Sequence, residues 1–302
     1  MVYKSEHFAE SAFERPVMLL ERLLALLTGV IVAVCLGFGL VMMAAGPAKK
    51  GVETPAPASR ADVADAPTTT QESATSQQPD HAAARARVEA IIAGAPEYAR
   101  FFERLRDAFP ADYETAIESL SADRLAGAGE ENVDYYLAEA VRLLRQSRGI
   151  LAAKAEPEPL ARVFDLHLEV LRAIAAQDKR LCVAFLYGGV DQEFHSFAAG
   201  RRALVADMAT AGLEAIFSGQ AKKIERTPPN EADFRALESA LAARGLGKIE
   251  IDALLDGKSP DPPLDDQTMC KAGQTYLEVL HALPEPIRLR IYGLAVELMA
   301  RS

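Results

Sequence analysis

The sequence predicts an all-α fold: an irregular multi-helix domain of about nine or ten helices, tethered to a single N-terminal transmembrane helix. Three observations support this prediction. An apolar run near the N-terminus contains no charged residue, and the segment that follows it lacks the large apolar side chains of a folded core. The remainder of the chain carries apolar residues at helical spacing, with no stretch of strand-like alternation.

The apolar run covers residues 23–45 and reads LLALLTGVIVAVCLGFGLVMMAA. A helix of this length is about 35 Å long, enough to cross the roughly 30 Å hydrocarbon core of a bilayer. We therefore expect a transmembrane helix behind a short N-terminal tail, residues 1–22. A cleaved signal peptide is the alternative, because a weak small-residue motif follows at 46–48. Signal peptides, however, usually have a shorter apolar region.

The segment 46–79 is expected to be a disordered linker. It is rich in Ala, Pro, Ser and Thr, and it contains no aromatic residue, Leu or Ile. Such a segment cannot bury enough apolar surface to offset the entropy lost on ordering. We interpret it as a tether between the membrane helix and the folded part of the chain.

Residues 80–302 are expected to form an acidic, all-helical domain, and this length also allows two smaller ones. The clearest helical pattern lies in 160–175, where apolar residues recur with a period of 3.6 residues. Further apolar stripes run through 133–144 and 287–298.

Prolines, glycines and capping residues predict where the helices begin and end. Pro110 and the segment AGAGEEN at 126–132 separate the early helices, and Pro157 opens a helix. Asp178, Asp191 and Asn230 are candidate N-caps, since Asp and Asn side chains accept hydrogen bonds from free amides at helix starts. The pattern predicts helices near 130–153, 231–243, 248–256, 264–282 and 285–301.

Composition and motifs exclude several classes of function. The chain has 33 Lys and Arg against 43 Asp and Glu, a net charge of −10. This balance argues against non-specific nucleic-acid binding, which needs clustered positive charge. The sequence contains no HExxH or CxxC metal motif, no glycine-rich phosphate loop and no GxSxG motif. We therefore assign no catalytic, metal or cofactor-binding residue and expect no cofactor.

Two cysteines of the helical part, Cys182 and Cys270, are candidates for a disulfide. The sequence leaves two unrelated buried thiols equally open, because spacing says nothing of the Cα separation. Cys182 lies in the apolar segment 180–189, which ends in two glycines. This segment predicts a buried central helix, or alternatively one wall of a cleft shared with the helix that carries Cys270.

Three aromatic residues are candidates for a cleft or an interface: Tyr187, His167 and His195. Tyr187 closes the apolar segment, and His167 lies on the apolar stripe with Phe164 and Leu171. The simpler interpretation of both histidines is a core or interface role, since neither belongs to a ligand motif.

The orientation in the membrane does not follow from charge, because the run has three basic residues on each flank: Lys4, Arg15 and Arg22 before it, and Lys49, Lys50 and Arg60 after it. The short N-terminal tail and the paired cysteine count favour a helical domain outside the cytoplasm, in the periplasm or its equivalent.

These observations predict a single-pass membrane-anchored helical interaction or scaffold module at the cell envelope. Its expected partners are membrane lipid, through residues 23–45, and another envelope protein or a cell-wall component. One alternative is a membrane-anchored hydrolase with a site assembled from dispersed acidic and histidine residues. Another is a regulatory scaffold that faces the cytoplasm.

Overall fold

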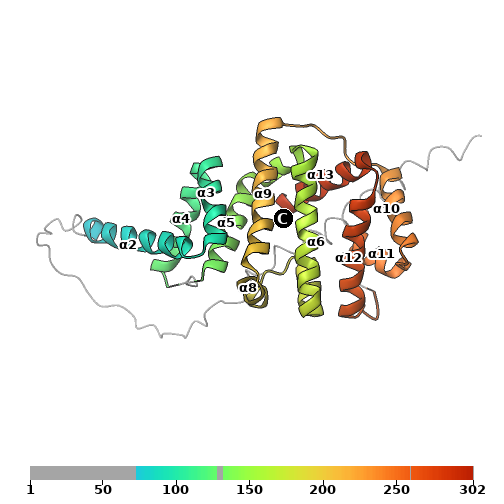
Figure 1. The fold of residues 1–302 in the computed structure, drawn as a ribbon, viewed down its shortest axis with the longest axis horizontal. Helices are drawn as coiled ribbons and strands as arrows, with labels where there is room; N and C mark the ends of the chain where they lie inside the picture. The colour runs from blue at the N-terminus through green and yellow to red at the C-terminus, as the bar shows by residue number, and fades with distance from the viewer. Residues whose placement is uncertain (1–72, 128–131, 259, 302) are drawn as a thin grey trace, which may run out of the picture. The chain divides into compact units, whose positions relative to one another are not determined.

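The computed structural model describes residues 73–127, 132–258 and 260–301, and these residues confirm the all-α class. They form twelve α-helices and one 3₁₀-helix, with no strand. Figure 1 shows how the helices are arranged within each part of the chain. The helix number is higher than the nine or ten expected. Part of the difference is the helix over 202–222, which the sequence pattern does not delimit because its small and apolar residues are spread around the helix.

The predicted tail, the apolar run 23–45 and most of the linker lie outside the described residues. Within the ranges that the structure does describe, no helix is both long and apolar enough to cross a bilayer. The first described helix begins at Ser73, earlier than the expected start at Asp80, so the last part of the 46–79 segment is helical.

The described helical residues divide into two compact units. Of the described residues, 73–143 belong to one unit and 144–301 to the other, and the boundary falls within the helix Val133–Arg148. Each unit has its own buried side chains and is described separately.

The 73–143 unit is built from four helices around an aromatic core. Its largest fully buried side chains include Tyr98, Phe101 and Ile117. The hydroxyl of Tyr98 donates a 2.6 Å hydrogen bond to buried Asp134, so the one polar atom of this side chain is satisfied inside the core. The helices are α2 (Ser73–Ala93), α3 (Pro96–Ala108), α4 (Pro110–Leu125) and α5 (Val133–Arg148).

The 144–301 unit contains the end of α5 and the remaining helices. Asn230 caps α10 through a reciprocal capping box with Asp233, and Asp178 and Asp191 cap α7 and α8, which confirms the three predicted N-caps. The helices are η1 (Gly149–Lys154), α6 (Pro157–Gln177), α7 (Lys179–Leu186), α8 (Gln192–Ala199), α9 (Arg202–Lys222), α10 (Glu231–Ala243), α11 (Lys248–Leu255), α12 (Asp266–Ala282) and α13 (Glu285–Arg301).

The 3₁₀-helix η1 lies at the centre of this unit, packed against α9 and α13. Gly219 of α9 touches it so closely that an added Cβ would lie 1.8 Å from the carbonyl oxygen of Leu151. Arg226 donates hydrogen bonds to the carbonyls of Ala153 and Ala155, which end the 3₁₀ turn. The expected single helix over 130–153 is therefore wrong at its C-terminal end, where tertiary contacts convert it into a tighter turn.

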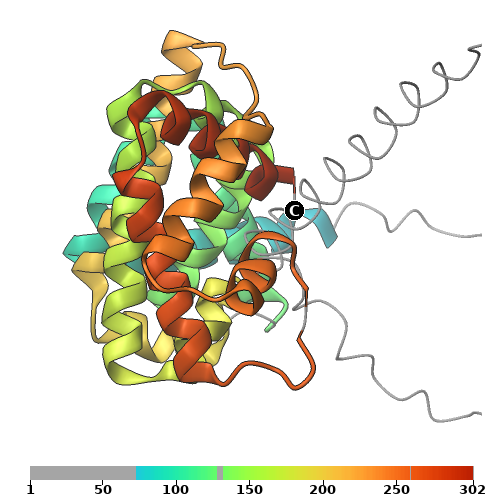
Figure 2. The ribbon, with the colours of Figure 1, turned by 90° about the vertical axis from the view of Figure 1, so that its right-hand side faces the viewer.

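Helices α6 and α12 lie side by side in this unit, and α7 packs against both of them. Figures 1 and 2 show the two long helices from two directions. Residues that are about a hundred positions apart in the sequence therefore meet along this pair of helices, and the candidate site is built on it.

Candidate functional site

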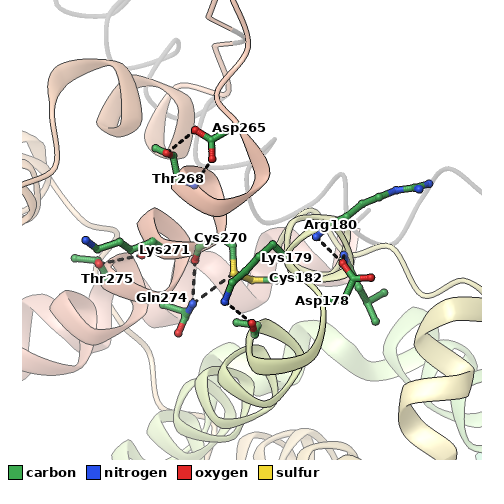
Figure 3. Close-up of a disulfide and its surroundings, with 12 residues drawn as sticks. Asp178, Lys179, Arg180, Cys182, Asp265, Thr268, Cys270, Lys271, Gln274 and Thr275 are labelled. Carbon is green, nitrogen blue, oxygen red and sulfur yellow. Dashed lines mark hydrogen bonds between the residues drawn. A yellow bond between two sulfur atoms is a disulfide. The ribbon is translucent and has the colours of Figure 1, made fainter.

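The predicted central segment forms α7 and is joined to α12 by a disulfide between Cys182 and Cys270 (Figure 3). The side chain of Asp178 accepts hydrogen bonds from the amides of Arg180 and Leu181, at 2.7 and 3.0 Å, and so acts as the N-cap of α7. The Cα atoms of the two cysteines are 5.6 Å apart, within the range that a disulfide requires.

The contact between α7 and α12 is tightly packed. Both cysteines are fully buried, and the α12 residue Gly273 leaves space for Leu186 of α7. A Cβ at Gly273 would lie 2.5 Å from a methyl carbon of that leucine. This contact therefore has the character of a buried core, the first of the two interpretations of segment 180–189.

Two of the three predicted aromatic candidates lie around α7, and their contacts are apolar. The ring of His167 stacks on Phe185, with centroids 4.7 Å apart, and Phe185 stacks in turn on Phe194 at 5.3 Å. Tyr187 directs its hydroxyl to the sulfur of Met269 at 3.7 Å. His195 follows Phe194 in α8, and its Nδ1 is buried with no hydrogen-bond partner among the described residues.

The surroundings of His167 keep its imidazole neutral. Burial without a charged partner lowers the pKa of His167 from 6.5 to about 4. Burial also raises the pKa of the Tyr187 hydroxyl above its ordinary value. His167 therefore packs against Phe185 of α7, and Tyr187, the C-cap of α7, contacts Met269 of α12.

A different group of residues surrounds a groove between α6 and α12, and we refer to it as the α6–α12 groove. It is a shallow groove of about 410 Å³ that is largely open to solvent. Charged side chains dominate its lining, which consists of Asp165, Leu168, Glu169, Arg172, Arg244, Glu278, His281 and Ala282.

The α6 wall of the groove follows directly from helix geometry. Asp165, Leu168, Glu169 and Arg172 are three, four and seven positions apart, so they share one face of the helix. Leu168 is buried and anchors this face, while the charged members of the row reach the groove. The apolar face of α6 packs into the interior of the unit, and the neighbouring face, which carries these charged residues, lines the groove.

The α12 wall carries Glu278 and His281, and each makes a contact with α6. His281 Nδ1 lies 2.8 Å from an oxygen of Asp165, and Arg172 donates a 2.8 Å hydrogen bond to Glu278. Arg244, the C-cap of α10, approaches the other oxygen of Glu278 at 3.8 Å. Three segments of the chain therefore converge on one charged surface.

The arrangement suits recognition of a charged partner. Asp165 lies at one end of the α6 row and Arg172 at the other, with Glu169 between them, and Arg244 approaches from the end of α10. An Asp–His contact is also found where a histidine acts as a general base. Among the residues that the structure describes, no group of three or more His, Cys, Asp or Glu side chains is placed to hold a metal ion.

A second hollow, of about 110 Å³, lies beside η1 and α13. Its basic side chains already have partners within the unit. Lys154 pairs with Glu225, Arg226 binds the backbone carbonyls of η1, and Arg290 forms two hydrogen bonds with Asp233. We therefore interpret this hollow as part of the structural framework.

The groove residues were not predicted from the sequence as a site. The signals available were the spacing of Asp165, Glu169 and Arg172 on one helix face, and of Glu278 and His281 three positions apart on another. Neither spacing shows which two helices become neighbours. Comparison of this chain with models of protein families, with curated proteins and with solved structures finds no match.

Proposed function

We propose that the protein is a single-pass membrane-anchored helical interaction module of the cell envelope, and that it binds its partner through the α6–α12 groove. The apolar run 23–45 supports the anchor, since it is long enough to span a bilayer and carries no charge. The partner class is another envelope protein or a cell-wall component.

The observation that carries the proposal is the convergence of Arg172, Glu278 and Arg244 on one groove from three helices. The guanidinium groups of Arg172 and Arg244 both approach the carboxylate of Glu278, and both arginine side chains are more than half exposed to solvent. Exposed ion pairs of this kind contribute little to stability. Their concentration around a groove is therefore better explained by binding than by folding.

The disulfide supports a location outside the cytoplasm, because cytosolic reductants keep most thiols reduced. Cys182 and Cys270 hold α7 against α12, the helix that forms one wall of the groove. On this proposal the cross-link holds the α12 wall of the groove in place.

The groove is tested by photo-crosslinking in native membranes. A photoreactive amino acid replaces the exposed residue Ala282, which lines the groove, or Ala199, an exposed alanine of α8 that does not. We expect a discrete adduct with one partner from position 282 and none from position 199. Equal adducts from both positions, or no adduct from either, would overturn the proposed use of the groove.

The location is tested by a reporter that is active only outside the cytoplasm, fused after Pro79, together with alkylation of free thiols in the unreduced full chain after denaturation, since both cysteines are buried in the folded protein. We expect an active reporter and no alkylation of Cys182 or Cys270. An inactive reporter with alkylated Cys182 and Cys270 would place the domain in the cytoplasm and favour the regulatory scaffold instead.

A membrane-anchored hydrolase is the second candidate, and the pair of Asp165 and His281 favours it. With the Nδ1 proton directed to the carboxylate, the other ring nitrogen of His281 is available to accept a proton from a water molecule. A hydrolase of this kind loses its activity with His281→Gln. If this variant keeps full partner capture from position 282 while a hydrolytic activity disappears, the enzyme interpretation is favoured.

A further inference from the structure

The α6–α12 groove has a separation of charge along its length, and this separation defines the ligand that it fits. Asp165 and Arg172 are seven residues apart on α6, which corresponds to about 10 Å along the helix axis. Glu169 adds a second carboxylate, whose only ion pair within the described part of the chain is a long one of 3.9 Å with Arg162. The α6 row therefore begins with the carboxylate of Asp165 and ends with the guanidinium of Arg172, and Glu169 lies between them.

The basic end has more donors than its own acceptor can satisfy. Arg172 and Arg244 together carry ten N–H groups, about five in each guanidinium. Among the described residues they share one carboxylate, Glu278, through one 2.8 Å hydrogen bond and one 3.8 Å ion pair. The N–H groups of Arg172 and Arg244 that Glu278 does not use are available to a second carboxylate, a group that arginine binds through paired hydrogen bonds.

The acidic end retains free acceptors. Asp165 uses one oxygen for His281, which leaves its other oxygen without a hydrogen bond among the residues described. Both carboxylates lie on the face of α6 that borders the groove. A cationic group placed near Asp165, about 10 Å from Arg172 along the helix axis, also lies about one helical turn from Glu169.

We propose that the α6–α12 groove binds the free C-terminal carboxylate of a partner protein that carries a lysine or arginine about three residues before its end. Three extended residues span about 10 Å, which matches the separation of the two ends of the groove. Arg172 and Arg244 bind the terminal carboxylate, and Asp165 and Glu169 bind the cationic side chain. This inference rests on the proposed function above and names the chemistry of the partner.

The test uses the full chain purified in detergent and the synthetic peptide acetyl-Lys-Ala-Ala-Ala, with either a free C-terminal carboxylate or a C-terminal amide. We expect calorimetric titration to show saturable binding of the free acid. The amide should bind about tenfold more weakly, because it loses a charge-assisted interaction with two arginines. Replacing the lysine of the peptide with alanine should also weaken binding.

Matched variants locate the binding in the groove. Arg172→Gln and Arg244→Gln, which lie on different helices, should each reduce the affinity for the free acid about tenfold. Arg235→Gln is the control, because Arg235 is an exposed arginine of α10 outside the groove. Binding of acid and amide with equal affinity, or unchanged affinity in both groove variants, would overturn the inference.

The two proposals fail in distinguishable ways. A specific adduct from position 282 together with no preference for the free acid would contradict the carboxylate inference and leave the groove as the binding surface. The absence of both the adduct and the peptide binding would contradict the proposed function itself.

Discussion

Arg172 of α6 and Glu278 of α12 form a 2.8 Å ion pair across 106 residues of chain, with Arg244 of α10 beside them. Three helices that are distant in the sequence therefore place complementary charges at one surface. The Arg172 side chain is 51% exposed, and pairs at such exposure are screened by water and salt. Removing this ion pair should therefore weaken binding of a partner without changing the stability of the fold, and the two effects can be measured separately.

Arg172→Gln should leave the free energy of unfolding almost unchanged. Because the pair is exposed, we expect a loss below about 1 kcal/mol. Urea unfolding followed by circular dichroism measures it. A loss of several kcal/mol would show that Arg172 is a structural residue, and it would remove the basis for assigning the groove to recognition.

Gly219→Ala should severely destabilise the 144–301 unit. The new Cβ would lie 1.8 Å from the carbonyl oxygen of Leu151, and the nearest atoms belong to the backbone of η1, which cannot move aside easily. We expect a loss of about 3 kcal/mol or more, or no folded protein.

Gly212→Ala is the matched control in the same helix, because a Cβ there has no atom within 4 Å. This substitution should stabilise the protein by about 0.5–1 kcal/mol, since alanine favours the helix more than glycine does. Thermal unfolding of the two variants compares them directly. If they behave alike, the close packing of α9 on η1 is not what constrains position 219.

His167 should make the stability depend on pH between about 6.5 and 4. Its pKa is lowered to about 4 in the folded protein from 6.5, so the unfolded chain binds a proton first as the pH falls. Stability therefore decreases over this window, by up to about 3 kcal/mol.

His167→Phe keeps an aromatic ring against Phe185 but cannot take up a proton. Urea unfolding at several pH values should show that the difference in stability between the parent and this variant changes between pH 6.5 and 4. A constant difference across the window would contradict a His167 that stays neutral in the folded protein.

Asp233 should stabilise the protein at neutral pH and lose this effect in strong acid. Hydrogen bonds from Arg290 hold the pKa of Asp233 below its ordinary 3.8, although burial acts in the opposite direction. The contribution is therefore present above about pH 3.8 and is lost as the pH falls through the folded value.

Asp233→Asn should cost about 2–4 kcal/mol at neutral pH, because it leaves the half-buried Arg290 guanidinium without its ion pair. Glu231→Gln, in the same first turn of α10, is the control, since its pair with Arg235 is exposed and long at 3.9 Å. Equal effects of the two substitutions in chemical denaturation would be inconsistent with a structural role for the Asp233–Arg290 pair.

Local sequence signals were sufficient for most of the helices in the 144–301 unit. Asn230 identifies the start of α10, and the predicted helices 264–282 and 285–301 agree with Asp266–Ala282 and Glu285–Arg301. These boundaries depend on capping and on prolines, which act within a few residues.

Tertiary contacts determine what the sequence could not show. Gly149, the first residue of η1, lies where an added Cβ would meet Ala300 of α13 at 2.9 Å, so the close approach of α13 favours glycine at the start of the 3₁₀ turn. The groove has the same origin. Arg172 and Glu278 are ordinary charged residues on solvent-facing rows until α6 and α12 become neighbours.

The most direct test of the account is the yield of the photo-crosslinked adduct from position 282 in native membranes, compared between the parent chain and the double variant Arg172→Glu, Arg244→Glu. We predict that the adduct disappears in the double variant and persists with Arg235→Glu, which reverses a charge outside the groove. An undiminished adduct in the double variant would contradict recognition of the partner by the α6–α12 groove.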